Sequence, residues 1–260
     1  MGRGLRFVAE QLSVRFCALE ALSGVDLTID GGERVAFVGP SGAGKTTLLR
    51  ALGASLMPSS GRVEVGGVDV GRCGVKEGRQ LRASIGFVPQ DHALVPNVRV
   101  VQNVVAGRVG TRSFLGSVRD YAWPSRATLD EVHSLLDRVG IEDKLFERTD
   151  RLSGGQRQRV AIARALYQRP LAILADEPVA SVDPSRARAV LELLTGISRE
   201  GGLTLCASLH NVDYAREFFD RVVGLRAGKV VFDSRTDELD DARLGKLYAL
   251  SADELLADGC

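Results

Sequence analysis

The sequence predicts an α/β fold, and three observations support this prediction. Residues 34–38, 171–175 and 203–209 are short apolar runs of the kind that form strands buried on both faces of a sheet. A segment of helix length separates the last two runs, which is the βαβ rhythm of a parallel sheet. Between about 91 and 165, apolar residues recur at helical spacing without a strand pattern, which predicts a helical subdomain inserted into the sheet domain.

The first third of the chain is predicted to consist mainly of strands. Residues 25–29 (VDLTI) and 62–65 (RVEV) alternate between apolar and polar side chains, and two glycines after the second run turn the chain back. Residues 34–38 (RVAFV) lead into a glycine-rich loop. A helix is predicted after this loop, ending at Pro58, with an apolar face made of Leu48, Leu49, Leu52 and Leu56.

The later elements follow from the same patterns. Leu129, Leu135 and Leu136 recur at helical period inside the predicted subdomain. Residues 221–225 (RVVGL) predict a further strand, and Gly228 turns it into a hairpin. We expect one domain, residues 1–260, divided into a catalytic core (about 1–90 and 166–232), a helical subdomain (about 91–165) and a C-terminal helical tail (about 233–260).

The composition is that of a globular protein with a mixed surface. The 34 basic and 33 acidic side chains leave a formal charge of +1, without the basic excess typical of nucleic-acid-binding proteins. The four cysteines are far apart, so a reduced, cytosolic setting without metal or disulfide is expected. Neither a secretory signal nor an apolar run of the roughly 18 residues that span a bilayer is found. Work at a membrane would therefore require other chains.

The glycine-rich loop matches the phosphate-binding P-loop pattern, GxxxxGK followed by Ser or Thr. Its glycines let consecutive backbone N–H groups converge on phosphate oxygens at a helix N-terminus. A glycine turn with a surface lysine is the alternative, but the position between a strand and a helix favours a nucleotide site. Lys45 would reach the β and γ phosphates and Thr46 would ligate Mg²⁺. The expected contacts with the nucleotide are Gly39, Pro40, Ser41, Gly42, Ala43, Gly44, Lys45, Thr46 and Thr47.

Asp176 and Glu177 come directly after the apolar run 171–175. A carboxylate at the end of a buried strand near a P-loop is suited to coordinate Mg²⁺, which is the expected role of Asp176. Glu177 could accept a proton from the water that attacks the γ phosphate, or orient that water. A solvated strand end is the alternative for such a pair, and the nearby P-loop favours the functional interpretation.

Residues 152–156 read LSGGQ. Ser153 can cap the helix that follows, and Gly154 and Gly155 allow the backbone to approach an anion closely. Taken alone, this stretch is a helix cap with a flexible turn. Together with the P-loop, the LAILADEP strand and a later histidine, it resembles the nucleotide-binding subunit of an ABC transporter, and the resemblance spans roughly residues 5–250.

The resemblance implies a P-loop NTPase (RecA-like) core with an N-terminal antiparallel β subdomain and an inserted α-helical subdomain. Gln90 resembles the glutamine that touches Mg²⁺ and couples the ATP site to the membrane subunits, and His210 resembles the histidine that contacts the γ phosphate. Residues 181–183, ending in Asp183, resemble the loop that crosses between two ATPase copies. Phe16 stands where the family places an aromatic ring against adenine, although it could also belong to the core.

The resemblance further implies a head-to-tail dimer with shared ATP sites. One copy would bind ATP through Phe16, the P-loop and Gln90, would ligate Mg²⁺ through Thr46, Gln90 and Asp176, and would use Glu177 and His210 as catalytic residues. The partner copy would complete the site in trans with Ser153, Gly154, Gly155, Gln156 and Asp183.

Three shorter stretches indicate which solute is transported. They are residues 103–117, 176–184 and 209–233, and they resemble the ATPases of phosphonate importers. Phosphite, phosphate or another small solute is the alternative, because membrane permease subunits and a separate solute-binding protein select the ligand. We expect these partners, no nucleic acid, and a peripheral location at the cytoplasmic face of the inner membrane.

Other protein classes fit less well. A soluble ABC ATPase of translation or DNA repair usually carries two ATPase units or a long coiled coil, and this chain has neither. A GTPase would need an NKxD motif, which is absent, and a small-molecule kinase would not explain LSGGQ or His210. In the helical segment, the aromatic residues Phe114, Tyr121 and Trp123 could dock a membrane subunit or pack the subdomain core; both alternatives stay open.

Overall fold

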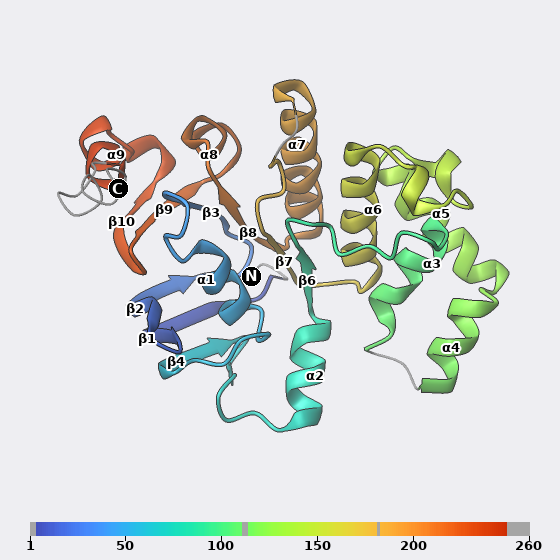
Figure 1. Cartoon of the computed structure of the whole chain (residues 1–260), viewed down its shortest axis with the longest axis horizontal. Helices are drawn as coiled ribbons and strands as arrows, with labels where there is room; N and C mark the ends of the chain where they lie inside the picture. Colours follow the sequence, from blue (N-terminus) through green and yellow to red (C-terminus); the bar gives the residue numbers. More distant parts are fainter. Residues whose placement is uncertain (1–3, 111–113, 181–182, 249–260) are drawn as a thin grey trace.

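The computed structural model of the chain describes residues 4–110, 114–180 and 183–248 (Figure 1). The strands are β1 (Phe7–Phe16), β2 (Leu19–Ile29), β3 (Arg34–Val38), β4 (Ser60–Val65), β5 (Val68–Asp69), β6 (Ile85–Val88), β7 (Ala172–Ala175), β8 (Thr204–Leu209), β9 (Arg221–Arg226) and β10 (Lys229–Arg235). The α-helices are α1 (Lys45–Leu52), α2 (Val75–Ala83), α3 (Val100–Val105), α4 (Phe114–Ala122), α5 (Arg126–Arg138), α6 (Gly154–Tyr167), α7 (Pro184–Gly201), α8 (Val212–Phe218) and α9 (Asp241–Tyr248).

The larger sheet has six strands in the order β10-β9-β3-β8-β7-β6. Strands β9, β3, β8, β7 and β6 are parallel, and β10 pairs antiparallel with β9 through the predicted hairpin at Gly228. The apolar runs that form β3, β7 and β8 are buried almost throughout, as predicted. Because parallel strands end at the same edge, the residues that follow β3, β6, β7 and β8 come together there.

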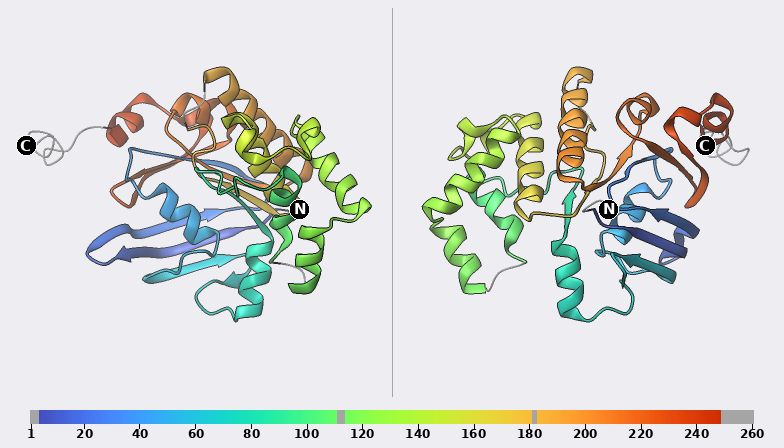
Figure 2. Two further views of the ribbon diagram at one scale, coloured as in Figure 1. Left: turned by 45° about the vertical axis from the view of Figure 1, so that its right-hand side comes forward. Right: turned by 180° about the vertical axis from the view of Figure 1, so that it is seen from behind.

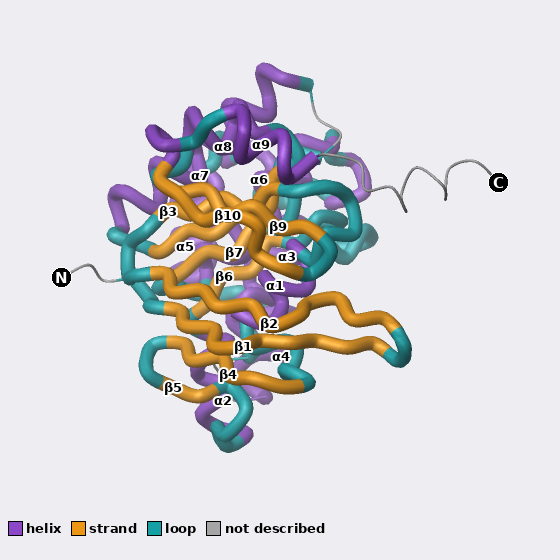
Figure 3. Tube along the Cα trace, turned by 90° about the vertical axis from the view of Figure 1, so that its left-hand side faces the viewer, coloured by secondary structure: helices purple, strands orange, loops and turns teal. Residues whose placement is uncertain are grey.

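The smaller sheet is antiparallel, with the order β2-β1-β4-β5. Figure 3 shows it beneath the strands of the larger sheet. Phe7 and Leu22 of this sheet share one buried cluster with Phe37 of β3 and with Leu48 and Leu49 of α1. The helix after the P-loop is therefore fixed between the two sheets by apolar contacts.

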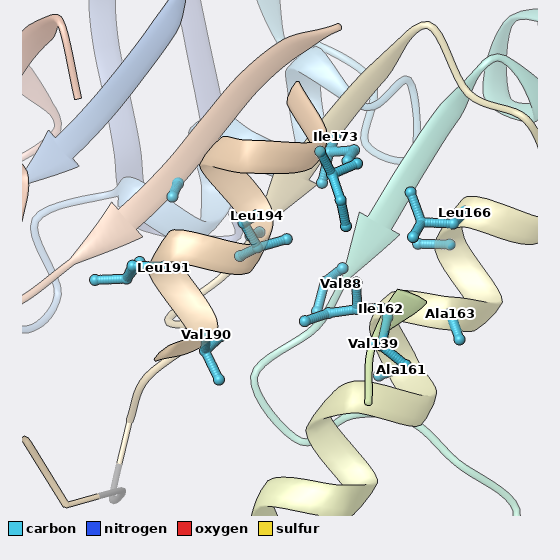
Figure 4. Close-up of a cluster of buried hydrophobic side chains, with 14 of the residues drawn as sticks. Val88, Val139, Ala161, Ile162, Ala163, Leu166, Ile173, Val190, Leu191 and Leu194 are labelled. Carbon is cyan, nitrogen blue, oxygen red and sulfur yellow. The ribbon is translucent and has the colours of Figure 1, made fainter. Parts of the chain in front are cut away.

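The helices α3, α4, α5 and α6 lie together beyond β6, at one edge of the larger sheet (Figures 1 and 2). A second buried cluster joins them to the sheet. Figure 4 shows Ile162 and Leu166 of α6 near Val88 of β6, with Ile173 of β7 and Leu194 of α7 on the other side. The helical region thus shares an apolar core with the parallel sheet. These tertiary contacts stabilise short helices that would be only marginally stable in isolation.

Most elements agree with the sequence predictions, and two do not. The helix after the P-loop was predicted to end at Pro58 but ends at Leu52, because Ala54 turns the chain with φ 51° and the N–H of Ser55 then donates to the carbonyl oxygen of Arg50. Helix α2 was not predicted, since the first third reads as strands. Its only large apolar side chains are Val75, which is 91% exposed, and Leu81, so it lacks an apolar face of helical period.

The expected division into core, helical subdomain and tail remains a prediction. Helix α6 continues to Tyr167, just past the predicted subdomain limit at 165, and α9 provides a helix in the predicted tail. Among the described residues, no helix combines the length and the apolar character that crossing a bilayer requires.

Candidate nucleotide-binding site

The P-loop lies between the end of β3 and the start of α1, at the edge where the parallel strands end. Gly39 has φ 149° and Gly44 has φ 101°, which are backbone conformations that residues with a side chain rarely adopt. A Cβ atom at Gly39 would lie 2.0 Å from the carbonyl oxygen of Leu225, and one at Gly44 would lie 2.7 Å from that of Ala21. Glycine is therefore required at both positions by backbone conformation and by space.

Lys45 begins α1 and is only 5% exposed. Its Nζ atom donates hydrogen bonds to the carbonyl oxygens of Gly39 (2.8 Å) and Pro40 (2.9 Å), so the ammonium group lies inside the loop that it follows. Burial lowers the pKa of Lys45 below its ordinary value, and the carboxylates of Glu177 and Asp176 partly offset this effect. The loop holds a desolvated cation at its centre.

Asp176 follows β7 and is 3% exposed. Its Oδ1 atom accepts hydrogen bonds from the hydroxyl groups of Thr46 (3.0 Å) and Ser208 (2.8 Å). The predicted pair Thr46 and Asp176 is thus brought together from β7 and α1. Ser208 was missed by the sequence reasoning, although a serine inside the apolar run 203–209 is a signal that could have identified it.

Glu177 has φ 45°, an unusual conformation for a residue other than glycine. One carboxylate oxygen accepts a hydrogen bond from Nε2 of Gln90 (2.8 Å), and the other lies 2.6 Å from Nε2 of His210. The His210 side chain is about half exposed, at 49%. Three predicted residues from the ends of β6, β7 and β8 therefore meet at one carboxylate.

A cavity of about 750 Å³ lies over these groups. Phe16, which is 45% exposed, lines it, so its ring is not part of the core. The lining also includes the start of β2 and the turn between β9 and β10, which the sequence predictions did not place at the site. The lining residues are Phe16, Leu19, Glu20, Ala21, Ser41, Gly42, Ala43, Gly44, Lys45, Thr46, Thr47, Gln90, Glu177, His210, Ala227 and Gly228.

The LSGGQ stretch lies outside this cavity. Ser153 caps α6, as predicted: its Oγ accepts from the N–H of Gln156, and its own N–H donates to Oε1 of Gln156. Gly154 starts the helix and is exposed. In Figure 1, and in the reverse view of Figure 2, α7 stands between α6 and α1. The two phosphate-type loops of one chain are thus not brought together.

Asp183 also lies outside the cavity, at the N-terminus of α7. Its carboxylate caps that helix by accepting hydrogen bonds from the Ser185 hydroxyl (2.6 Å) and the N–H of Arg186 (3.1 Å). These hydrogen bonds hold the pKa of Asp183 below its ordinary value. Ser181 and Val182, the other residues of the predicted crossing loop, lie outside the described residues.

Arg164 of α6 is a further residue that the sequence reasoning did not identify. Its guanidinium donates to the carbonyl oxygens of His92 (2.8 Å) and Ala93, which are two and three residues after Gln90. His92 and Ala93 have φ 65° and 46°, so this loop is bent into a conformation that needs support. Arg164 therefore ties the helix that begins at LSGGQ to the loop that carries Gln90.

The predicted aromatic cluster is only partly described. Trp123, just after α4, is 77% exposed, so its ring does not pack in the subdomain core. Tyr121 is half-buried, and the side chain of Phe114 lies outside the described residues.

Comparison with known proteins identifies one family and several similar proteins. The ABC transporter family matches residues 22–180. The chain is 48% identical over 231 residues to the phosphonates import ATP-binding protein PhnC 2 of Pseudomonas aeruginosa, covering 88% of this chain and 85% of that protein. It is 44% identical over 229 residues to PhnC 2 of a Synechococcus species, covering 88% of this chain and 84% of that protein.

Two solved structures support the same assignment. The dimeric structure of a bacterial ABC transporter cassette aligns with a TM-score of 0.79 and 29% identity, covering 88% of this chain and 98% of that chain. A dimeric post-hydrolysis cassette bound to ADP and phosphate aligns with a TM-score of 0.76 and 29% identity, covering 89% and 98%. The fold, the P-loop and these relatives agree, and the chain belongs to the ABC transporter family.

Proposed function

We propose that this chain is the ATP-hydrolysing subunit of an ABC importer that takes up phosphonates. The two relatives described above are phosphonates import ATP-binding proteins, and they match most of this chain. The observation that carries the ATPase part is the position of Glu177, whose carboxylate lies at the P-loop cavity between Gln90 and His210. A carboxylate held in this way is suited to accept a proton from a water molecule.

ATP binds in the cavity that the P-loop and Phe16 line. The exposed ring of Phe16 stacks on the adenine, as an aromatic side chain at the rim of a nucleotide site can do. The phosphates take the place of the Gly39 and Pro40 carbonyl oxygens as hydrogen-bond acceptors for Lys45. The N–H groups of the loop and the N-terminus of α1 supply the remaining positive potential.

The residues expected to hold Mg²⁺ fit that ion. Mg²⁺ prefers oxygen ligands and is usually bound by one or two protein oxygens together with substrate phosphates. Thr46 and Asp176 present a hydroxyl and a carboxylate 3.0 Å apart, and Gln90 lines the same cavity with its amide. When bound, the ion neutralises negative charge on the β and γ phosphates. Thr46, Asp176 and Gln90 are the residues that would hold it.

Glu177 and His210 act on the γ phosphate. Glu177 orients the attacking water and accepts its proton, and Gln90 and His210 hold the carboxylate by its two oxygens. His210 is half exposed, so its ring is accessible to the γ phosphate and can stabilise charge that develops there. These residues move one proton and bind one phosphate group, which is the chemistry that ATP hydrolysis requires.

A second copy completes the site. Ser153, Gly154, Gly155, Gln156 and Asp183 do not line the cavity of their own chain, so they contribute only if another chain brings them there. In a head-to-tail dimer, the LSGGQ of each copy covers the γ phosphate bound by the P-loop of the other. The two solved relatives described above are dimeric cassettes, which supports this arrangement.

The dimer works with membrane permease subunits and a solute-binding protein, as a peripheral protein at the cytoplasmic face of the inner membrane. The exposed ring of Trp123 favours the docking alternative for the aromatic residues, because a side chain that is 77% exposed in one chain is available to a partner.

The test is ATP hydrolysis by the complete transporter in lipid vesicles, with its permease and solute-binding protein. Phosphonate, phosphite, phosphate and an amino acid are added in turn to the side of the membrane that holds the solute-binding protein. We expect phosphonate to stimulate hydrolysis most. Stimulation by phosphate or phosphite alone would identify that ion, rather than phosphonate, as the solute. No response to any phosphorus oxyanion would reject the proposed class of substrate. Absence of Mg²⁺-dependent hydrolysis in any condition would reject the ATPase itself.

A further inference from the structure

Ser208 is a fully buried polar residue in the middle of the larger sheet. It lies in β8, where its neighbours Cys206, Ala207 and Leu209 are apolar and at most 1% exposed. A hydroxyl group in such surroundings is retained in native proteins when its hydrogen-bonding capacity is used. The contacts of this hydroxyl therefore indicate why a serine, rather than another small apolar residue, stands at this position.

The Ser208 hydroxyl connects two consecutive residues of the site. Its Oγ atom donates to Oδ1 of Asp176 at 2.8 Å and accepts a hydrogen bond from the N–H of Glu177 at 2.7 Å. One side chain thus touches the carboxylate expected to bind the metal ion and the backbone of the residue expected to activate water. Both the donor and the acceptor function of the hydroxyl are used.

The contact with Asp176 fixes the rotation of its carboxylate. Oδ1 accepts from Ser208 on one side and from Thr46 on the other, whereas Oδ2 accepts no hydrogen bond from the described part of the chain. One oxygen is therefore anchored to the protein, and the other is left for a further ligand. Without the Ser208 hydroxyl, the carboxylate would be anchored by Thr46 alone, which is itself an expected metal ligand.

The contact with Glu177 supports an unusual backbone conformation. The N–H of Asp176 continues the sheet by donating to the carbonyl oxygen of Val88 in β6 at 2.8 Å. At Glu177 the chain turns, with φ 45°, and its N–H is bound by the side chain of Ser208 instead of a backbone carbonyl of β8. The hydroxyl thus replaces one hydrogen bond of the sheet and stabilises the turn that presents the Glu177 carboxylate.

The geometry points to Ser208 as a positioning residue that sets both the Mg²⁺ affinity of the site and the placement of the catalytic carboxylate. This inference rests on the proposed ATPase function, and it adds a residue that acts through Asp176 and Glu177 without touching the nucleotide. Residues that orient metal ligands typically change metal affinity or activity about 10–100-fold when they are replaced.

The test compares Ser208→Ala with Ser208→Thr, which keeps the hydroxyl, and with Ser198→Ala as a matched control. Ser198 is also a buried serine, 1% exposed, but its hydroxyl donates to the carbonyl oxygen of Leu203 (2.7 Å) and does not line the cavity. Four quantities are measured for each full-length variant: the thermal unfolding temperature, kcat, the free Mg²⁺ concentration at half-maximal ATP hydrolysis, and the affinity for a fluorescent ATP analogue with Mg²⁺ and with EDTA.

We expect Ser208→Ala to raise the Mg²⁺ concentration for half-maximal hydrolysis about tenfold or more and to lower kcat by a similar factor. Its affinity for the ATP analogue in EDTA should stay unchanged, so that only the gain in affinity on adding Mg²⁺ is reduced. Ser208→Thr should keep the Mg²⁺ dependence of the wild type, even if its extra methyl group lowers the unfolding temperature. Ser198→Ala should lower the unfolding temperature and leave the Mg²⁺ dependence as in the wild type.

A Ser208→Ala variant with a wild-type Mg²⁺ dependence and a wild-type kcat would overturn the inference and leave the ATPase proposal intact. If Ser208→Ala does not fold, Ser208→Thr carries the test together with Ser208→Cys, whose thiol is a weak donor. The inference then requires that the threonine variant keeps the wild-type Mg²⁺ dependence and that the cysteine variant loses it. A wild-type protein that hydrolyses no ATP would instead refute the proposed function.

Discussion

The Nε2 atom of His210 lies 2.6 Å from Oε1 of Glu177, while Gln90 donates to the other oxygen of the same carboxylate at 2.8 Å. His210 follows β8, Glu177 follows β7 and Gln90 follows β6, so three adjacent strand ends converge on one charged group. Glu177 is expected to accept a proton and His210 to stabilise charge on the γ phosphate, so replacing each residue in turn tests these two roles in hydrolysis.

Glu177→Gln removes the proton acceptor while keeping the size of the side chain. We expect ATP hydrolysis to be abolished and an ATP-bound dimer to accumulate, because the step that reopens the dimer is lost. Phosphate release measures the first effect, and sedimentation with saturating ATP measures the second. Glu192→Gln, at an exposed position of α7, is the matched control. Hydrolysis at the normal rate, or a monomer at saturating ATP, would contradict the assigned role.

His210→Ala should lower kcat by about 100–1000-fold with little change in ATP affinity, because the ring is expected to stabilise charge that develops on the γ phosphate. Steady-state kinetics and equilibrium binding of ATP separate the two quantities. His133→Ala is the control, since His133 lies on α5 and is exposed. An unchanged kcat, or a loss confined to ATP affinity, would show that His210 does not act in the chemical step.

Lys45→Ala should weaken ATP binding by at least tenfold, which corresponds to about 1.4 kcal/mol. Lys45 is a buried cation within the P-loop, so its charge lies where the phosphates are expected to bind. Lys76→Ala, in the exposed first turn of α2, is the control. The affinity is measured with a fluorescent ATP analogue, and equal binding by Lys45→Ala and wild type would argue against phosphate binding by this loop.

Phe16→Ala should weaken binding of ATP more than it changes kcat, because stacking of an aromatic ring on a base is worth about 1–3 kcal/mol. Phe16→Tyr should restore most of the affinity, and Phe146→Ala provides a control at another exposed phenylalanine. The sharpest readout is the comparison of ATP with inorganic triphosphate. If Phe16→Ala weakens both ligands equally, the ring does not contact the adenine.

Mixed dimers test whether LSGGQ acts on the partner chain. A Cβ atom at Gly154 would meet no other atom within 4 Å in the single chain, so Gly154→Asp should fold and place a negative charge against the partner's ATP. Lys45→Ala inactivates the P-loop of its own chain. Each variant alone should be inactive, but equal mixtures should regain about a quarter of the sites if chains pair at random, because half of the dimers then contain one intact site.

Recovery of hydrolysis after mixing the two inactive proteins would be difficult to explain if each chain formed its own complete site. Conversely, a mixture that stays inactive although both variants form dimers with wild type would refute the shared-site arrangement. Mixing Gly154→Asp with itself at the same total concentration controls for concentration effects.

The sequence predicted those parts of the structure that depend on local patterns. Apolar runs identified β3, β7 and β8, because strands buried on both faces need apolar side chains throughout. The P-loop, Asp176 and Glu177 follow directly from these strands. The family resemblance then supplied roles for Gln90 and His210, and the structure places both beside the Glu177 carboxylate.

Other features could not be predicted because they depend on contacts between distant segments. Ser208 is marked in the sequence only as a polar residue inside an apolar run, and the pairing of β7 with β8 is what brings its hydroxyl to Asp176 and gives it a role. Arg164 resembles any arginine on an amphipathic helix until the fold places it against the loop after Gln90. Helix α2 escaped prediction for a local reason, since it buries too few apolar side chains to show a period.

The hydrogen bonds at the start of α6 have a consequence for which ligand this surface can accept. In the cap, the Ser153 hydroxyl and the Gln156 amide oxygen each accept one hydrogen bond within the chain, which uses one of the two lone pairs of each atom. The hydroxyl proton of Ser153 and the amide N–H₂ of Gln156 have no partner among the described residues. These free donors lie at the N-terminus of α6, where unpaired backbone N–H groups add positive potential, so the single chain already favours an anion at this surface before any partner chain binds.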